Sequence, residues 1–155
     1  MKTATLLILL CLLTGCGALY RFAKSGPVGW EIKRQLRNRG VRTVSLAQVT
    51  PFVWSELFLF NPYSSRDSVC KTLGIELAQC SKVVTSEFVD EGVVLLVFRN
   101  SGVVVHSELH FRFHGDFAPV PPNQPIARAA ASFQAVAEGQ SSSGEQWLKL
   151  QLTQP

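Results

Sequence analysis

The stretch GVVLLVFRNSGVVVHSELHFRF, residues 92–113, carries the strongest structural signal of the chain. Its first part, Val93–Phe98, is entirely apolar, and Asn100-Ser101-Gly102 has the composition of a tight turn. In the second part, Val103–Phe113, large apolar residues alternate with polar ones from Leu109 onward. We therefore predict a β-hairpin whose first strand is fully buried and whose second strand has one face on the core.

A second buried strand is predicted at Pro51–Phe60. Two interleaved sets of side chains are both largely apolar there: Phe52, Trp54, Phe58 and Phe60 in one set, and Val53, Leu57 and Leu59 in the other. A strand that is apolar on both faces is typical of the centre of a sheet that is covered on both sides. The turn residues Asn61-Pro62-Tyr63-Ser64 end it.

Two helices are predicted before and after this strand. Residues Pro27–Arg39 carry apolar side chains every four positions, with a proline in the first turn and Gly40 after the end. A shorter helix extends to Leu73, capped by Ser64 or Ser65 and followed by a glycine.

Three further strands complete the prediction. A short one lies at Val41–Leu46, and Ser132–Glu138 and Trp147–Leu152 form a final hairpin. The alanine content of Ala127–Ala137 leaves a helix there as the alternative. We expect an α+β fold: an antiparallel β-sheet of about five to six strands with one or two helices packed on one face, in a single domain over residues 27–155.

The basic residues are concentrated near the start of the chain. The net charge of +4 is modest, and the apolar content of 46% with 17% charged residues is typical of a folded domain. Residues 20–42 contain seven Lys or Arg against Glu31 alone, whereas the chain from Thr43 onward has seven basic and ten acidic residues. The remainder is therefore net negative.

The first residues are organised as an export signal. Lys2 is followed by the apolar run Ala4–Leu13, which is shorter than the roughly 20 residues of a membrane-spanning helix but fits the core of a signal peptide. The run ends in Leu13-Thr14-Gly15-Cys16, which resembles the lipobox of bacterial lipoproteins. The alternatives are an ordinary secretory signal that is cut near Ala18 and an uncleaved membrane anchor.

The lipobox resemblance implies a location for the protein. Residues 1–15 would be removed as the signal peptide, Cys16 would carry acyl chains such as palmitate, and residues 16–26 would form the lipidated N-terminus and tether. Several acyl chains anchor a protein stably where one does not. Because Gly17 stands where lipoproteins retained at the inner membrane often carry an acidic residue, the resemblance favours the outer membrane, facing the periplasm.

The basic stretch would then lie beside the lipid bilayer. Anionic headgroups attract juxtamembrane Lys and Arg at about 1 kcal/mol each. The residues concerned are Arg21, Lys24, Lys33, Arg34 and Arg37. A solvated basic helix face is an equal alternative, and nucleic acid is not expected as a partner of an exported protein.

The four cysteines have separate roles. Cys11 leaves with the signal peptide and Cys16 is the predicted lipidation site, so Cys70 and Cys80 remain. In an oxidising envelope compartment we predict that these two form a disulfide. Their separation matches no standard pair of zinc ligands.

No catalytic or metal-binding constellation is visible. His106, His110 and His114 recur every four residues, but on a strand each lies about 13 Å from the next, too far to share one metal. We interpret them as a polar sheet face. Glu56 falls among aromatic residues, which leaves two interpretations: a perturbed carboxylate of a functional site, or a structural ion pair with a basic residue of the first helix such as Arg34 or Arg37. We favour the ion pair. No catalytic residue, metal or other cofactor is predicted.

These observations favour a binding protein over an enzyme. We expect a non-enzymatic module of the cell envelope, an assembly factor or an inhibitor or immunity-type protein, that binds another envelope protein. The candidate contact residues are Trp54, Glu56 and Tyr63, in a motif-like aromatic stretch. The alternative is a small envelope hydrolase with an unrecognised active site.

Overall fold

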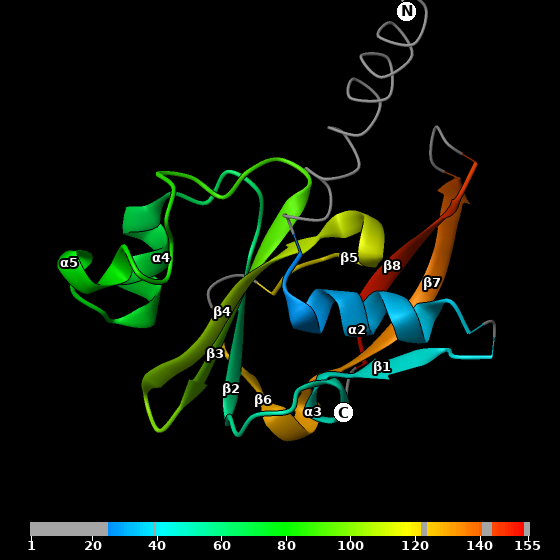
Figure 1. Ribbon diagram of the computed structural model, residues 1–155, viewed down its shortest axis with the longest axis horizontal. Coiled ribbons are helices and arrows are strands. Elements are labelled where there is room, and N and C mark those ends of the chain that lie inside the picture. Colours follow the sequence, from blue (N-terminus) through cyan, green and yellow to red (C-terminus); the bar gives the residue numbers. More distant parts are fainter. Residues whose placement is uncertain (1–24, 39, 122–123, 141–143, 154–155) are drawn as a thin grey trace, which may run out of the picture.

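The computed structural model describes residues 25–38, 40–121, 124–140 and 144–153. Residues Cys16, Arg21 and Lys24 lie outside these ranges, as do the predicted signal peptide and most of the predicted tether. Within the described residues the chain forms two four-stranded sheets with helices packed against them (Figure 1). The predicted α+β class, rich in antiparallel strands, is confirmed.

The first sheet, sheet 1, has the strand order β4-β3-β2-β6, with all neighbours antiparallel. Its strands are β2 (Glu56–Phe60), β3 (Val93–Asn100), β4 (Val103–Phe111) and β6 (Ile126–Ala127). The predicted hairpin of β3 and β4 is present, and both Ser101 and Gly102 in its turn have positive φ.

The second sheet, sheet 2, has the order β1-β7-β8-β5. It contains β1 (Thr43–Ser45), β5 (Asp116–Phe117), β7 (Ser132–Gln140) and β8 (Gln146–Leu152). The predicted C-terminal hairpin is the antiparallel pair β7–β8, whereas β5 joins β8 in parallel. The helical alternative for Ala127–Ala137 is wrong, because only a single 3-10 turn, η2 (Arg128–Ala130), precedes β7.

One sheet of five to six strands was expected, and the strands are instead divided between two sheets. Sheet 1 is covered on both faces by separate apolar clusters, which is why β2 is apolar on both sides. Leu57 and Leu59 pack toward α2 (Pro27–Leu36), α3 (Leu46–Val49) and sheet 2. Phe58 and Phe60 pack on the opposite cluster.

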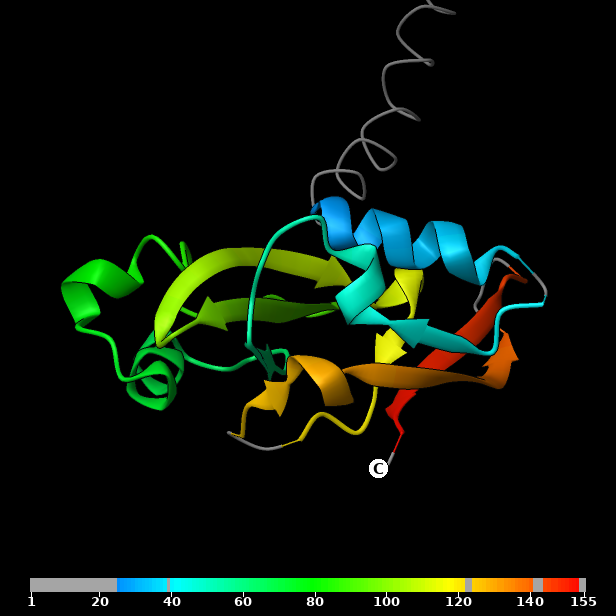
Figure 2. The ribbon, with the colours of Figure 1, turned by 90° about the horizontal axis from the view of Figure 1, so that it is seen from below.

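The opposite cluster belongs to residues 61–92, which connect β2 to β3 and contain the helices α4 (Arg66–Leu73) and α5 (Leu77–Cys80). Figures 1 and 2 show this segment at one end of the molecule, with α2 and sheet 2 at the other. The predicted cap is Ser65, whose side chain accepts a hydrogen bond from the backbone N–H of Ser68, and Gly74 ends α4 in the left-handed conformation.

Two of the predicted elements are shorter in the structure. Strand β2 begins only at Glu56, so Phe52 and Trp54 do not share its alternation: both pack on the α2 side, and Val53 is 75% exposed. Helix α2 ends at Leu36 rather than at residue 39. Its Val28 and Ile32 are buried as its apolar spacing predicts.

The disulfide between Cys70 and Cys80 is present and ties α4 to α5. Both cysteines lie in the apolar cluster beneath the segment 61–92. Because the segment has little regular structure apart from these two short helices, the cross-link is a main constraint on its conformation.

We predict that replacing both Cys70 and Cys80 by Ser lowers the free energy of unfolding by about 2 to 3 kcal/mol, the chain entropy released when so short a loop is opened. Equilibrium denaturation in urea measures this change. Wild-type protein treated with dithiothreitol should match the double variant. Equal unfolding midpoints for oxidised and reduced protein would show that the disulfide adds no stability.

Candidate binding surface

Most of the strongly exposed apolar side chains belong to two parts of the chain, the segment 61–92 and the edge strand β4. Six large apolar residues are strongly exposed in the described chain: Val53, Tyr63, Leu77, Phe88, Val103 and Val105. All except Val53 lie on the segment 61–92 or on the first half of β4. Single exposed apolar residues need no explanation, but Val103 and Val105 lie together on an edge strand, which is typical of an interaction surface.

Strand β4 is the edge of sheet 1, and the two halves of its outer side differ. The second half is covered by the residues that precede α2: the backbone N–H of Gly26 donates to the carbonyl oxygen of Leu109, and the N–H of Phe111 donates to Oγ of Ser25. The folded unit thus includes Ser25 and Gly26, which the sequence interpretation placed in the tether. Along the first half, Val103–Ser107, β4 pairs only with β3, and in the described chain no strand pairs with its outer side.

A groove runs between this open half of β4 and helix α5. Its volume is about 480 Å³, and it is lined on one side by Ile75, Gln79, Lys82 and Val83 and on the other by residues 102–107. Val105 is the additional residue of a β-bulge, because Phe98 pairs with His106 whereas Arg99 pairs with Val104. Bulges at sheet edges change the direction of side chains, and here three successive valines line the groove.

The predicted contact residues are dispersed. Trp54 is 2% exposed and its indole N–H donates to the hydroxyl of Thr50, so this prediction is wrong: Trp54 is a core residue. Tyr63 is 65% exposed, as a contact residue must be. Desolvation and the nearby Glu91 raise the pKa of the Tyr63 phenol.

Glu56 does form an ion pair, but not with the residues expected. It pairs at 2.8 Å with Arg99, its cross-strand neighbour on β3, and not with Arg34 or Arg37. Arg34 instead pairs with Glu31 on the same helix. A cross-strand partner depends on the register of two strands, which the sequence pattern does not specify.

The predicted polar sheet face is also wrong, because β4 turns its polar residues toward the core. Glu108 is 8% exposed and accepts hydrogen bonds from the backbone N–H groups of Val28 and Gly29, at 3.2 and 2.8 Å. It also bonds to Nε2 of His106, at 2.8 Å. The carboxylate therefore satisfies the first turn of α2, where negative charge is favourable.

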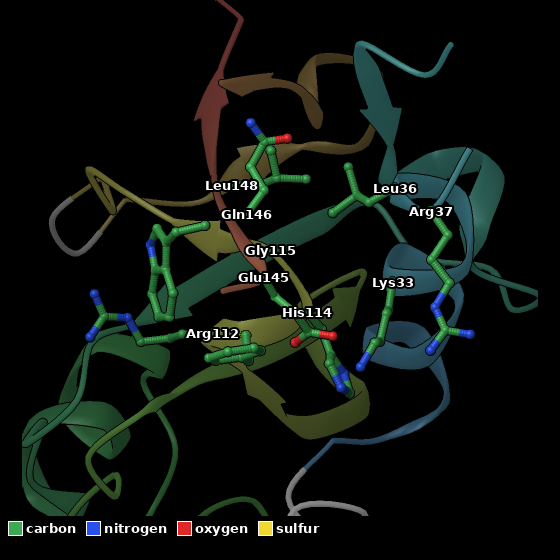
Figure 3. A pocket seen from close by; sticks show the side chains of 11 residues that line it. Lys33, Leu36, Arg37, Arg112, His114, Gly115, Glu145, Gln146 and Leu148 are labelled. Carbon is green, nitrogen blue, oxygen red and sulfur yellow. The ribbon is translucent and has the colours of Figure 1, made fainter. Parts of the chain in front are cut away.

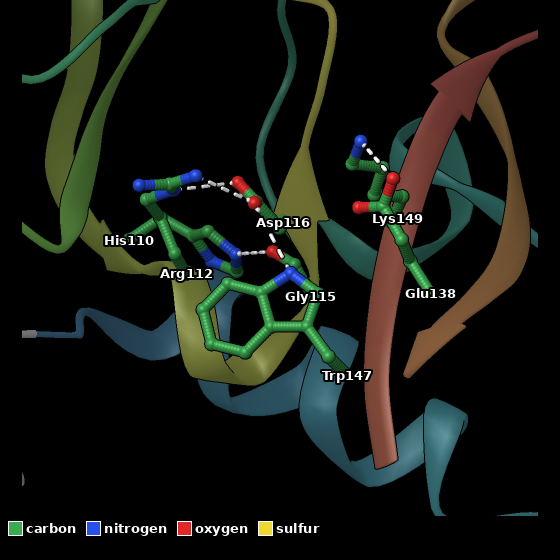
Figure 4. Close-up of polar contacts among 7 residues, drawn as sticks. All are labelled: His110, Arg112, Gly115, Asp116, Glu138, Trp147 and Lys149. Carbon is green, nitrogen blue, oxygen red and sulfur yellow. Dashed lines mark hydrogen bonds and ion pairs between the residues drawn. The ribbon is translucent and has the colours of Figure 1, made fainter. Parts of the chain in front are cut away.

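His110 is completely buried beneath α2. Its Nε2 lies 2.6 Å from the carbonyl oxygen of Gly115, which can only accept, so Nε2 carries the proton (Figure 4). Nδ1 has no hydrogen-bond partner among the described residues. Burial lowers the pKa of His110 to about 4, against the weaker opposing effects of the Gly115 hydrogen bond and Asp116.

No group of three His, Cys, Asp or Glu in the described ranges is placed to hold a metal ion. His106 and Glu108 resemble part of a catalytic triad, but Ser107 projects from the opposite face of β4, since neighbouring residues of a strand alternate.

The basic residues predicted to lie at a membrane divide into two groups. Lys33 and Arg34 are on α2 and Arg37 is its C-cap residue, whereas Arg21 and Lys24 lie outside the described residues. None of the described helices has the length and apolar character that crossing a bilayer requires.

Comparisons with protein-family models, curated proteins and solved structures find no match for this chain.

The burial of His110 predicts loss of stability in acid. The unfolded chain binds a proton with the ordinary pKa of 6.5, and the folded chain only at about 4. Unfolding therefore takes up a proton between these values, and the free energy of unfolding falls as the pH falls through this range. From pH 7 to pH 5 the loss from His110 is about 2 kcal/mol.

The substitution H110Q tests this, because the amide can still donate to Gly115 but does not titrate in this range. Urea denaturation at pH 7 and at pH 5 should show a smaller acid destabilisation in the variant, by about 2 kcal/mol. The comparison is made within each protein, so a general cost of the substitution cancels. An unchanged difference between the two pH values would contradict a neutral buried imidazole.

Proposed function

We propose that this protein is a lipid-anchored envelope lipoprotein that binds an extended segment of another protein along the open half of β4. The observation that supports the proposal most is the unpaired edge Val103–Ser107, apolar and bordered by the groove of α5. Proteins usually protect such edges with charges, prolines or a covering element. Here the covering residues, Ser25 and Gly26, stop at the second half of the strand.

The geometry fits the mode of recognition in which a peptide adds a strand to a sheet. Its backbone would pair with the outer N–H and C=O groups of β4, and alternate side chains would enter the groove. The groove offers apolar contacts at Ile75, Val83 and Val105 and one cation at Lys82. The partner segment would therefore carry alternating apolar residues and an acidic residue that faces Lys82.

The proposed anchor keeps this edge near the membrane. The chain between Cys16 and Ser25 is short, so that even when fully extended it spans no more than about 30 Å. Ser25 itself is fixed to β4 by its hydrogen bond to Phe111. A partner would thus be an envelope protein at or near the same membrane, consistent with an assembly factor or an inhibitor of an envelope protein.

A charge on the β4 edge should abolish partner binding. We predict that Val105→Lys reduces at least tenfold the amount of a stoichiometric partner captured from detergent-solubilised envelopes, because lysine at an edge opposes strand addition. The matched control is Val53→Lys, which also places a lysine at an exposed valine but away from the groove. Equal recovery with the two variants would contradict the β4 edge as the binding surface.

The anchor has a separate test. We predict that Cys16→Ser abolishes acylation, because the thiol of Cys16 is the proposed acyl acceptor. Growth with labelled palmitate followed by immunoprecipitation measures incorporation into the wild type and the variant. A wild-type protein that takes up no label and keeps residues 1–15 would replace the lipoprotein proposal with an uncleaved anchor.

A further inference from the structure

The groove beside β4 continues into a second pocket further along the same strand. This pocket has a volume of about 180 Å³, and its two sides are residues 82–86 and residues 107–109. It shares Lys82, Val83 and Ser107 with the groove. The groove and the second pocket are therefore neighbours along one side of β4, between this strand and the residues that follow α5.

A depression at the other end of the molecule differs from this pair, because its charged side chains do not converge. It lies between the end of α2 and the start of β8 (Figure 3). Lys33 and Arg37 extend from the end of α2, whereas the guanidinium of Arg112 points away from them. Arg112 donates instead to both carboxylate oxygens of Asp116. The cations that line this depression are thus not placed to hold one ligand together.

The apolar lining of the second pocket belongs to the core. Val84, Val89 and Leu95 are each at most 4% exposed and are members of the cluster beneath the segment 61–92. Because the fold already fixes these side chains, the pocket can take an apolar side chain at a low cost in ordering. Its volume suits a small aliphatic side chain, whereas the groove, at about 480 Å³, has room for an aromatic one.

The backbone of β4 limits an added strand to the open half. The residues before α2 already bond to the outward groups of Leu109 and Phe111. Outward groups recur at every second residue of an edge strand, so those of Ser107 also point outward. No strand of the described chain pairs with them. The last pairing position of a bound segment is therefore at Ser107, where the groove and the second pocket meet.

The two pockets can take two side chains of one bound strand. The groove contacts β4 at residues 102–107 and the second pocket at residues 107–109, so the two adjoin at Ser107. Side chains two residues apart on a strand share a face and lie about 7 Å from each other. A strand whose last pairing position is at Ser107 can therefore place one side chain in the second pocket and a side chain two residues away in the groove.

Lys82 supplies the charge of this site. It lines both the groove and the second pocket, is exposed, and has no ion-pair partner within the described residues. The lining of the second pocket also includes Glu108, whose carboxylate is already bonded to α2 and to His106. A negative charge on a ligand therefore meets Lys82 without competition from an unpaired carboxylate in this lining.

We propose that the groove and the second pocket together select the segment that binds to β4. The segment carries a large apolar side chain in the groove and a small one, two residues away, in the second pocket. An acidic residue next to this pair on the same face lies opposite Lys82. The inference rests on the proposed function, because it takes a strand bound along the open half of β4 as its premise.

Two labelled peptides of the same composition test the spacing, TDTFTVTDT and TDTFVTTDT in one-letter code. The first places its two apolar side chains on one face of a strand, and the second places them on opposite faces. Fluorescence anisotropy with the full-length protein in a non-ionic detergent measures both dissociation constants. We expect the first peptide to bind at least about fivefold more tightly.

Reversal of charge tests Lys82. We expect K82E to weaken binding of the first peptide at least about fivefold and to favour TKTFTVTKT, in which lysines replace its aspartates. The matched control is K71E, because Lys71 is an exposed lysine of α4 that lines neither the groove nor the second pocket. This control should change either constant less than about twofold. Thermal unfolding of both variants checks that the fold is intact.

Three results would overturn the proposal: no saturable binding of the first peptide to the wild-type protein, equal binding of the two peptides of the same composition, or equal effects of K82E and K71E. Partner capture with Val105→Lys is a separate measurement. If that substitution abolishes capture while the two peptides bind equally, only selection by the pockets is wrong. If it leaves both capture and peptide binding unchanged, the β4 edge itself is not the binding surface.

Discussion

The buried carboxylate of Glu108 is the interaction on which the arrangement of the other elements depends. A charged group removed from water is stable only when its oxygens are satisfied, and here two backbone N–H groups of α2 and the ring of His106 satisfy them. The contact is possible because Gly26 has no side chain: a Cβ atom there would lie 2.4 Å from Oε2 of Glu108. The start of α2 is thereby fixed against β4.

Fixing α2 in this way determines which part of the β4 edge stays open. The residues that lead into the helix cover the second half of the β4 edge and leave the first half open. Its buried face covers His110, which accounts for a histidine without charge in the core. Its last turn carries Leu36 against Gly115, where a Cβ atom would lie 2.8 Å from the Leu36 side chain. One buried carboxylate thus holds α2 against β4 and places the residues that cover part of the strand edge.

Local patterns predicted the elements better than their assembly. The hairpin of β3 and β4, the cap at Ser65 and the pair β7–β8 follow from turn chemistry and alternation within short windows. The partner of Glu56 and the division into two sheets depend on register and on contacts between distant segments. Trp54 precedes β2, which begins only at Glu56, so its burial does not follow the alternation of the strand. No residue pattern in the sequence indicated this start.

The histidines show why a polar alternation was misinterpreted. A strand with His and Glu at every second position is typical of a solvated face, because unpaired polar groups are costly to bury. On β4 the cost is offset by partners that are remote in sequence: the N-terminus of α2 for Glu108 and the carbonyl of Gly115 for His110. The face of β4 that looks solvent-exposed in the sequence is therefore buried, and its polar side chains connect β4 to α2 and to Gly115.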